Sequence, residues 1–133
     1  MNPLLEEYFD SVEICLIESP AVSSYTLIRR EISPVDGKLR IKAELDDNSL
    51  LEFFLYLKKT GGQVRPAKYS FHWQNAQGRV IKRWDNAPHH PGLDNAPHHL
   101  HIGDDAVEGL RNIPDIFFVV KQIEAAVAQG TED

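Results

Sequence analysis

The central part of this sequence reads as a run of short β-strands, and this limits the chain to a small set of folds. In residues 38–45 apolar and polar side chains alternate with a period of two, which is typical of a strand with one buried face. Turn signals rich in proline, glycine, asparagine and aspartate separate such segments. Because short connections join antiparallel neighbours, the pattern predicts an antiparallel sheet of about five strands. The expected strands are residues 25–32, 38–45, 50–58, 69–74 and 79–84.

Helical periodicity flanks the strands at both ends. Apolar residues repeat at spacings of three and four in residues 4–18, and again in a segment that begins at Pro114 and ends at Gly130. The predicted core stripe of the second helix is Ile116, Phe117, Val120, Ile123 and Val127. Strands in one run with helices at either end indicate an α+β fold, with N- and C-terminal helices on one face of the sheet. We expect a single domain that spans residues 1–133.

The third expected strand, residues 50–58, is apolar on both faces. Its second face carries Leu50, Phe54 and Tyr56, which a half-exposed strand would leave in contact with water. Two arrangements would bury them. Either the chain forms a homodimer that covers Phe54 and Tyr56, or the terminal helices lie on that side.

Charge is distributed unevenly along the chain. The formal net charge is −6, yet residues 58–83 hold seven of the 14 basic residues and none of the 20 acidic ones. Such a segment can attract a phosphate backbone, although it can also be a solvated face that lacks acids. The candidate nucleic-acid-binding residues are Lys68, Arg79, Lys82 and Trp84. Trp84 would stack on a base, whereas tryptophan more commonly packs in the core.

Cellular location follows from composition. No apolar run approaches the ~20 residues that a membrane helix requires, and no signal-peptide pattern is present. The single cysteine, Cys15, cannot form an intramolecular disulfide and falls on the apolar side of the first helix. We expect a cytoplasmic protein without a membrane segment, in which Cys15 packs in the core.

Five of the six histidines lie in one stretch, residues 85–101. The hexapeptide DNAPHH occurs there twice, at residues 85–90 and 94–99, and His101 follows. Proline and glycine exclude a continuous helix or a long strand. Imidazole both accepts and donates protons near neutral pH and is the commonest metal ligand in proteins. The stretch is therefore the candidate functional site.

Neighbouring strands are expected to deliver other polar side chains to the same place. His72 lies on the fourth strand, and the hairpin at residues 75–78 places it opposite Ile81 or Lys82, depending on the register. The fifth strand leads through Arg83 and Asp85 into the repeat. We expect the candidate catalytic residues to converge in one pocket, namely His72, Arg83, Asp85, His90, His99 and His101.

Alternation separates the last three histidines if residues 98–102 are extended. His99 and His101 then share one face, where they can act together. His98 shares the other face with Leu100 and Ile102, which predicts that His98 is the buried structural histidine of the three.

The histidine stretch admits three interpretations. It can be a rigid proline-rich turn whose imidazoles bond to backbone carbonyls. It can bind a divalent metal through His99, His101 and His89 or His90, with Asp85 or Asp94 as a ligand or a second-shell residue. It can also perform metal-free acid–base chemistry on a phosphodiester, with Arg83 or Lys82 stabilising the phosphorane and Asp85 orienting a histidine. The third interpretation requires no cofactor, and the second leaves a divalent metal open.

Three segments resemble the TumE-like toxins of bacterial toxin–antitoxin systems: residues 69–74 (YSFHWQ), 83–90 (RWDNAPHH) and 97–101 (PHHLH). The chain departs from the family at residues 94–96, where the family more often has a bulky residue before PHHxH. The resemblance covers nearly the whole chain. It implies a small cytoplasmic toxin that is neutralised by a cognate antitoxin, typically a helix-turn-helix DNA-binding protein. RNA cleavage is one interpretation of the residues above and is not implied by the resemblance.

Overall fold

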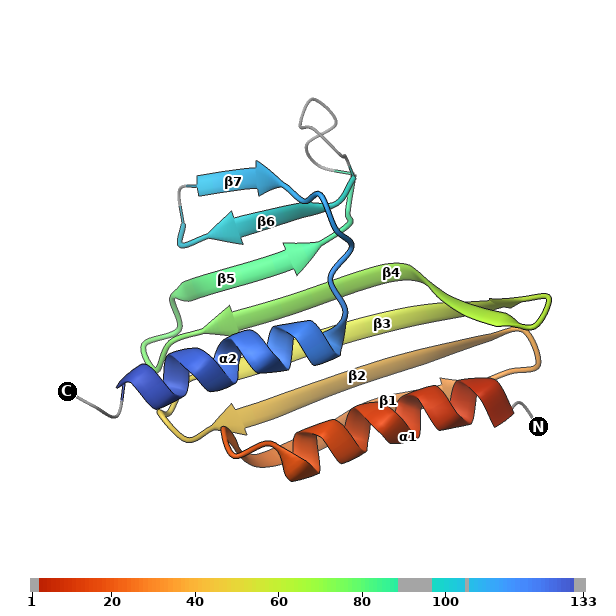
Figure 1. Ribbon diagram of the computed structural model, residues 1–133, viewed down its shortest axis with the longest axis horizontal. Coiled ribbons are helices and arrows are strands. Elements are labelled where there is room, and N and C mark those ends of the chain that lie inside the picture. Colours follow the sequence, from red (N-terminus) through yellow and green to blue (C-terminus); the bar gives the residue numbers. More distant parts are fainter. Residues whose placement is uncertain (1–2, 89–96, 105, 131–133) are drawn as a thin grey trace.

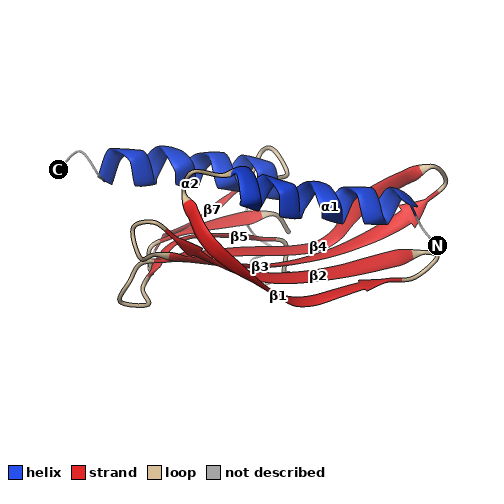
Figure 2. Cartoon of the chain, turned by 90° about the horizontal axis from the view of Figure 1, so that it is seen from below, coloured by secondary structure: helices blue, strands red, loops and turns tan. Residues whose placement is uncertain are grey.

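The computed structural model describes residues 3–88, 97–104 and 106–130. Two helices pack on one face of an antiparallel sheet, and the chain crosses the sheet strand by strand between them (Figures 1 and 2). Neither of the two described helices is long and apolar enough to cross a membrane. The elements are α1 Pro3–Glu18, β1 Val22–Ile32, β2 Asp36–Leu45, β3 Leu50–Thr60, β4 Gln63–Gln74, β5 Val80–Asp85, β6 His99–Ile102, β7 Ala106–Gly109 and α2 Ile116–Gly130.

The described strands form one sheet in the order β1-β2-β3-β4-β5-β6-β7, and each is antiparallel to its neighbour. The α+β class, the sequential order and the flanking helices match the prediction. The strand number was wrong, because the sheet has seven strands and not about five. The additional strands, β6 and β7, have four residues each, and an alternation as short as HLHI in β6 does not distinguish a sheet strand from an extended loop.

The third and fourth strands are longer than the expected segments 50–58 and 69–74. Thr60 at the end of β3 pairs with Gln63 at the start of β4 across a tight turn. Gly61 adopts a φ of 64°, a left-handed conformation that glycine reaches without steric cost. The hairpin therefore extends well beyond the aromatic part of β4, as the long pair β3 and β4 in Figure 1 shows.

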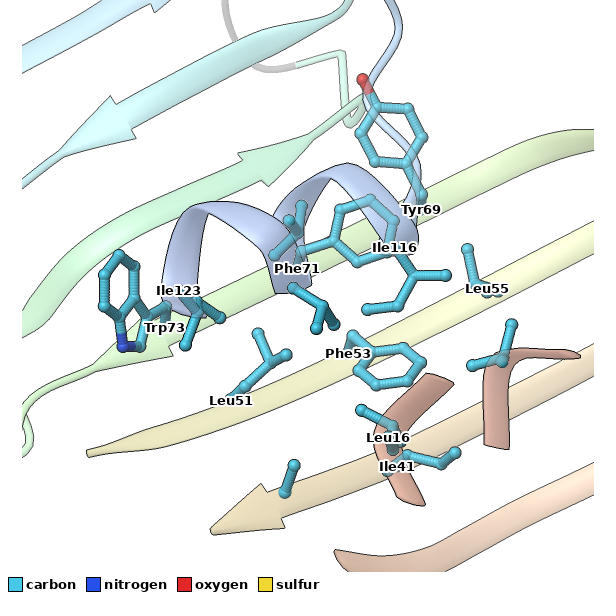
Figure 3. Close-up of a cluster of buried hydrophobic side chains, with 14 of the residues drawn as sticks. Leu16, Ile41, Leu51, Phe53, Leu55, Tyr69, Phe71, Trp73, Ile116 and Ile123 are labelled. Carbon is cyan, nitrogen blue, oxygen red and sulfur yellow. The ribbon is translucent and has the colours of Figure 1, made fainter. Parts of the chain in front are cut away.

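The hydrophobic core lies between the helices and the face of the sheet that they cover. Figure 3 shows Ile116 and Ile123 of α2 above the aromatic side chains of β3 and β4. Phe9 of α1 is fully buried and packs so closely on β2 that a Cβ at Gly37 would lie 2.9 Å from its ring. In α2, Val119 is buried, whereas Phe117 is only partly buried.

Phe54 and Tyr56 lie on the opposite face of the sheet, which we call the open face. The helices cover the side of the sheet that carries Leu51, Phe53, Leu55 and Leu57. The alternative in which the helices cover Phe54 and Tyr56 was therefore wrong. Both rings are instead partly exposed and flanked by cations. The Arg40 guanidinium lies 4.9 Å from the Phe54 ring centroid, and the Tyr56 hydroxyl donates to Asp36 over 2.8 Å. A homodimer through this face stays a prediction.

A buried and an exposed aromatic residue on the helices should contribute differently to the free energy of unfolding. Replacing the fully buried Phe9 with alanine should lower the free energy of unfolding by about 3–5 kcal/mol, because it removes apolar contacts and leaves a cavity. Phe118, which is 47% exposed, is the matched control, and F118A should change that free energy by about 0.5 kcal/mol or less. Urea unfolding of both variants tests this. Equal losses would mean that α1 does not pack on the sheet as described.

Candidate active site

Three neighbouring strands bring the polar residues of the site to the open face. Residues paired across a sheet share a face, and the register pairs His72 with Arg83 and Arg83 with His101. The next row pairs Asp85 with His99. The intervening residues Phe71, Trp84 and Leu100 point to the core.

The register between β4 and β5 differs from the expected one. His72 lies opposite Arg83, and not opposite Ile81 or Lys82. The reason is a bulge next to the hairpin, where Ile81 is the extra residue between the partners of Trp73 and Gln74. The bulge advances β5 by one residue and sets the guanidinium directly beside the His72 ring.

The carboxylate of Asp85 is the centre of the site. The residue is only 4% exposed and lies at the end of β5. Its Oδ2 accepts a hydrogen bond from Arg83 Nε over 2.9 Å, and its Oδ1 accepts one from the Ala87 backbone N–H over 3.1 Å. The Nε2 atoms of His99 and His101 lie 2.8 and 3.9 Å from Oδ1 and Oδ2 respectively. A buried carboxylate with these donors remains satisfied as an anion.

His99 is held by oxygen atoms on both sides of its ring. Nδ1 lies 2.8 Å from the Pro97 carbonyl, which can only accept, so this nitrogen carries a proton. Nε2 faces the Asp85 carboxylate, which is also an acceptor. The arrangement is satisfied when both nitrogens are protonated, or when a cation other than a proton lies between Nε2 and the carboxylate. At 2% exposure His99 positions Asp85 and does not face solvent.

The opposite end of the site is a neutral histidine. Arg83 donates from Nη1 to His72 Nδ1 over 3.3 Å, and since a guanidinium has no acceptor, Nδ1 carries the lone pair. His72 Nε2 then bears the hydrogen and donates to Gln74 Oε1 over 3.1 Å. Arg83 thus connects the His72 ring to the Asp85 carboxylate.

Tyr69 and His98 form a separate pair next to the site. Their rings are stacked with centroids 5.7 Å apart, and the Tyr69 hydroxyl lies 2.9 Å from His98 Nδ1. Burial, followed by the negative charge of Asp85, raises the pKa of Tyr69 above its usual value. The phenol therefore stays protonated at neutral pH, and its hydroxyl shares a hydrogen bond with His98 Nδ1.

The face assignment of the last histidines was right and the burial assignment was wrong. His99 and His101 share the open face, and Leu100 points to the core. The buried histidine, however, is His99 and not His98, which is partly buried. His98 precedes β6 and stacks on Tyr69, whereas His99 lies directly opposite the buried Asp85.

The predicted nucleic-acid-binding residues do not share a surface. Lys68 is exposed on the open face, and Arg79 is exposed at the β4–β5 turn. Lys82 points to the helices, where its ammonium donates to Gln122 over 3.3 Å. Trp84 is 2% exposed, so its predicted stacking on a base was wrong, because alternation along β5 places its ring in the core.

The three side chains around the carboxylate could also hold a metal ion. Asp85, His99 and His101 each offer one ligand atom, and these atoms lie within 4.8 Å of one another. The Pro97 carbonyl would orient His99 from behind, as carbonyl groups do for many metal-bound histidines. The predicted candidates His89, His90 and Asp94 lie outside the described residues.

Two hollows on the open face adjoin the site, and the sequence analysis did not predict them. One of about 370 Å³ is lined by His72 and Arg83 together with Arg40, Glu52, Phe54 and Gln74. The other, of about 230 Å³, is lined by Arg83, Asp85, Phe54 and Lys68. The alternation of Glu52 and Phe54 with the buried residues of β3 places both side chains on this face, but the sequence prediction considered only Phe54 and Tyr56 there, as part of a dimer interface.

The fold and the site define an α+β protein with a buried carboxylate and a row of histidine and arginine side chains on an open sheet face. The model of the family described as Toxin TumE matches residues 12–130, which is most of the chain. The chain therefore belongs to the TumE toxin family. No curated protein and no solved structure matches it. Membership of a toxin family implies an antitoxin partner.

The burial of His99 leads to a stability prediction. Replacing His99 with alanine should lower the free energy of unfolding by about 3–5 kcal/mol, because it removes the partner of a buried carboxylate. His101, whose side chain is 28% exposed, is the matched control, and H101A should cost about 1 kcal/mol or less. Thermal or urea unfolding of the two variants provides the comparison. Equal stability would show that the Asp85–His99 contact contributes little.

Proposed function

We propose that this toxin acts by cleaving RNA, with the row His72–Arg83–His101 as its catalytic residues. The observation that carries the proposal is the pairing of these residues side by side across β4, β5 and β6 on the open face. Adjacent strands lie about 5 Å apart, so the two histidines flank the guanidinium at a separation that a phosphodiester can span.

The proton positions assign the roles. When Arg83 turns its Nη1 from His72 to the phosphate of bound RNA, the lone pair on His72 Nδ1 becomes free and takes the proton of a ribose 2′-hydroxyl, whose oxygen attacks the adjacent phosphorus. His101, beside the Asp85 carboxylate, is the protonated partner and transfers a proton to the 5′-oxygen that leaves. Arg83 stabilises the negative charge on the phosphorane. The products are a 2′,3′-cyclic phosphate and a free 5′-hydroxyl, and each histidine ends in the other's starting state.

Asp85 and His99 act as positioning residues in this proposal. Asp85 holds Arg83 through Nε and faces His101, so it sets the orientation of both. His99 supports the carboxylate from the buried side. The predicted catalytic roles of these two residues therefore become indirect.

The biological setting of the proposal rests on the family and on the proposed substrate. A toxin that cleaves RNA would act in the cytoplasm. The cognate antitoxin would be a helix-turn-helix protein that neutralises the toxin by binding to it.

Catalysis by the row predicts a specific pattern of mutant activities. H72A and H101A should each lower the rate of RNA cleavage by about 10²–10⁴-fold, the usual contribution of a general base or acid. K82A is the control, because Lys82 lies on β5 but on the other face of the sheet, and it should retain the wild-type rate. Gel assays with purified protein and a defined single-stranded RNA measure the rates, and growth arrest on expression gives an independent readout.

The pH profile separates the two histidines. The wild-type rate should be bell-shaped, since one histidine must be neutral and the other charged. Residual activity of H72A should lose its acidic limb, and that of H101A its alkaline limb. Full activity of either variant would reject the proposal.

A metal-dependent centre is the second candidate. It rests on the convergence of Asp85, His99 and His101, whose ligand atoms fit one divalent ion with open positions for water or substrate. Such an ion would replace the Nε2 proton of His99 opposite the carboxylate. His101 would then be a ligand and not an acid.

Metal content decides between the candidates. If the centre is metallic, protein purified without chelator should contain about one equivalent of a divalent ion by elemental analysis, since the three residues form one site. D85N and H101A should lose it and H72A should keep it. Removal of the ion should abolish RNA cleavage. Unchanged cleavage by chelator-treated, metal-free protein would exclude this candidate and favour acid–base chemistry.

A further inference from the structure

The hollow of about 370 Å³ beside the catalytic row is a second feature of the open face that the chemistry above does not use. His72 and Arg83 form the wall that it shares with the site, and Phe54 with Ser70 lies between it and the second hollow. Arg40, Glu52 and Gln74 also line it, and of these Glu52 is the cross-strand partner of His72 and Gln74 is hydrogen-bonded to the His72 ring. A group bound there would contact the catalytic row directly.

Phe54 and Arg40 form a stacking platform in this hollow. The ring is partly exposed on the face that the helices leave uncovered, and the Arg40 guanidinium lies 4.9 Å from its centroid. Aromatic rings and guanidinium planes are the two groups on which proteins stack unpaired nucleobases. The same pair would be an unfavourable site for a purely apolar ligand, because Arg40 would have to be desolvated.

The carboxylate of Glu52 lies in the same hollow as the platform. Glu52 lies opposite His72 in the register and accepts a hydrogen bond from Arg40 Nη1 over 3.2 Å. Its carboxylate only accepts hydrogen bonds, so it suits the exocyclic amino group of a base and repels a phosphate. The carboxylate therefore marks the base end of the hollow.

Positive charge lies where the phosphates would run. Arg83 lines both hollows, and Lys68 lines the second one, on the other side of Phe54. A strand that places one base on the stacked pair of Arg40 and Phe54 would direct its adjacent phosphate to Arg83 and the next one toward Lys68. Cations beside an aromatic platform are the usual arrangement for single-stranded nucleic acid.

We propose that the hollow lined by Phe54, Arg40 and Glu52 is a subsite for a nucleobase of single-stranded RNA, next to the phosphate that is cleaved. The base stacks on the guanidinium of Arg40, which lies over the Phe54 ring and is supported by it, and Glu52 selects bases with an amino group over uracil. The proposal rests on RNA being the substrate and adds to it the base and the strand form that the site accepts.

Binding of short RNA to full-length toxin tests the subsite without relying on cleavage. The H101A background prevents turnover, and fluorescence anisotropy follows fluorescein-labelled single-stranded oligomers of C, A or U. Phe54→Ala and Phe54→Leu should each weaken binding about tenfold or more, because leucine keeps volume but cannot stack. Tyr56→Ala is the matched control. Tyr56 lies two residues along the same face and lines neither hollow, so its binding should stay within about twofold.

A separate variant tests the selection of the base. In the same background Glu52→Gln should reduce the preference for C and A over U, since its side chain both donates and accepts hydrogen bonds. An unchanged preference would overturn the role of Glu52. Equal binding by the Phe54 and Tyr56 variants would overturn the subsite itself.

Two further outcomes separate this inference from its premises. If the otherwise wild-type protein cleaves no RNA but Phe54→Leu still weakens binding, RNA cleavage is wrong and the base subsite stands. If cleavage is normal, Phe54→Leu should raise KM about tenfold with kcat changed less than threefold. Light scattering that shows a dimer dissociated by Phe54→Leu would assign this face to a second copy of the chain and reject the subsite.

Discussion

The buried carboxylate of Asp85 is the interaction on which the site depends. A carboxylate at 4% exposure is stable only where donors replace its lost hydration, and here the guanidinium of Arg83, the ring of His99 and the Ala87 N–H do so. These donors come from β5, β6 and the chain that follows β5. The same contacts that satisfy the charge thus hold two strands in register and fix the position of Arg83.

The two faces of the sheet differ in composition and in role. The helices seal one face with apolar side chains, which stabilises the fold and leaves the other face free to carry polar chemistry. Side chains alternate between the two faces along each strand, so Trp84 points to the core while its neighbours Arg83 and Asp85 point to the open face. The open face consequently gathers cations, histidines and the partly exposed Phe54, features that a purely structural face would not require.

Much of the fold was predictable because its signals are local. Long segments with a period of two or 3.6 identified both helices and the first five strands, and short turns implied sequential antiparallel pairing. The errors lie where the local signal is weak. Strands β6 and β7 are too short for their pattern to distinguish a strand from an extended loop, and the bulge near Gln74 shifted the partner of His72 to Arg83. Burial of His99 could not be read from its neighbours in the sequence, since its cover comes from Asp85 and the Pro97 carbonyl.

The sequence by itself determined which residues are candidates for proton transfer or metal binding and which face of each strand they occupy, because side-chain alternation and the clustering of histidines are properties of the chain alone. Only the tertiary structure decided how they combine. Register across three strands placed His72, Arg83 and His101 in one row and enclosed Asp85 with His99. It also put Glu52 opposite His72 and Arg40 over Phe54. Such relations depend on strand pairing over long sequence separations, where a single bulge changes every contact.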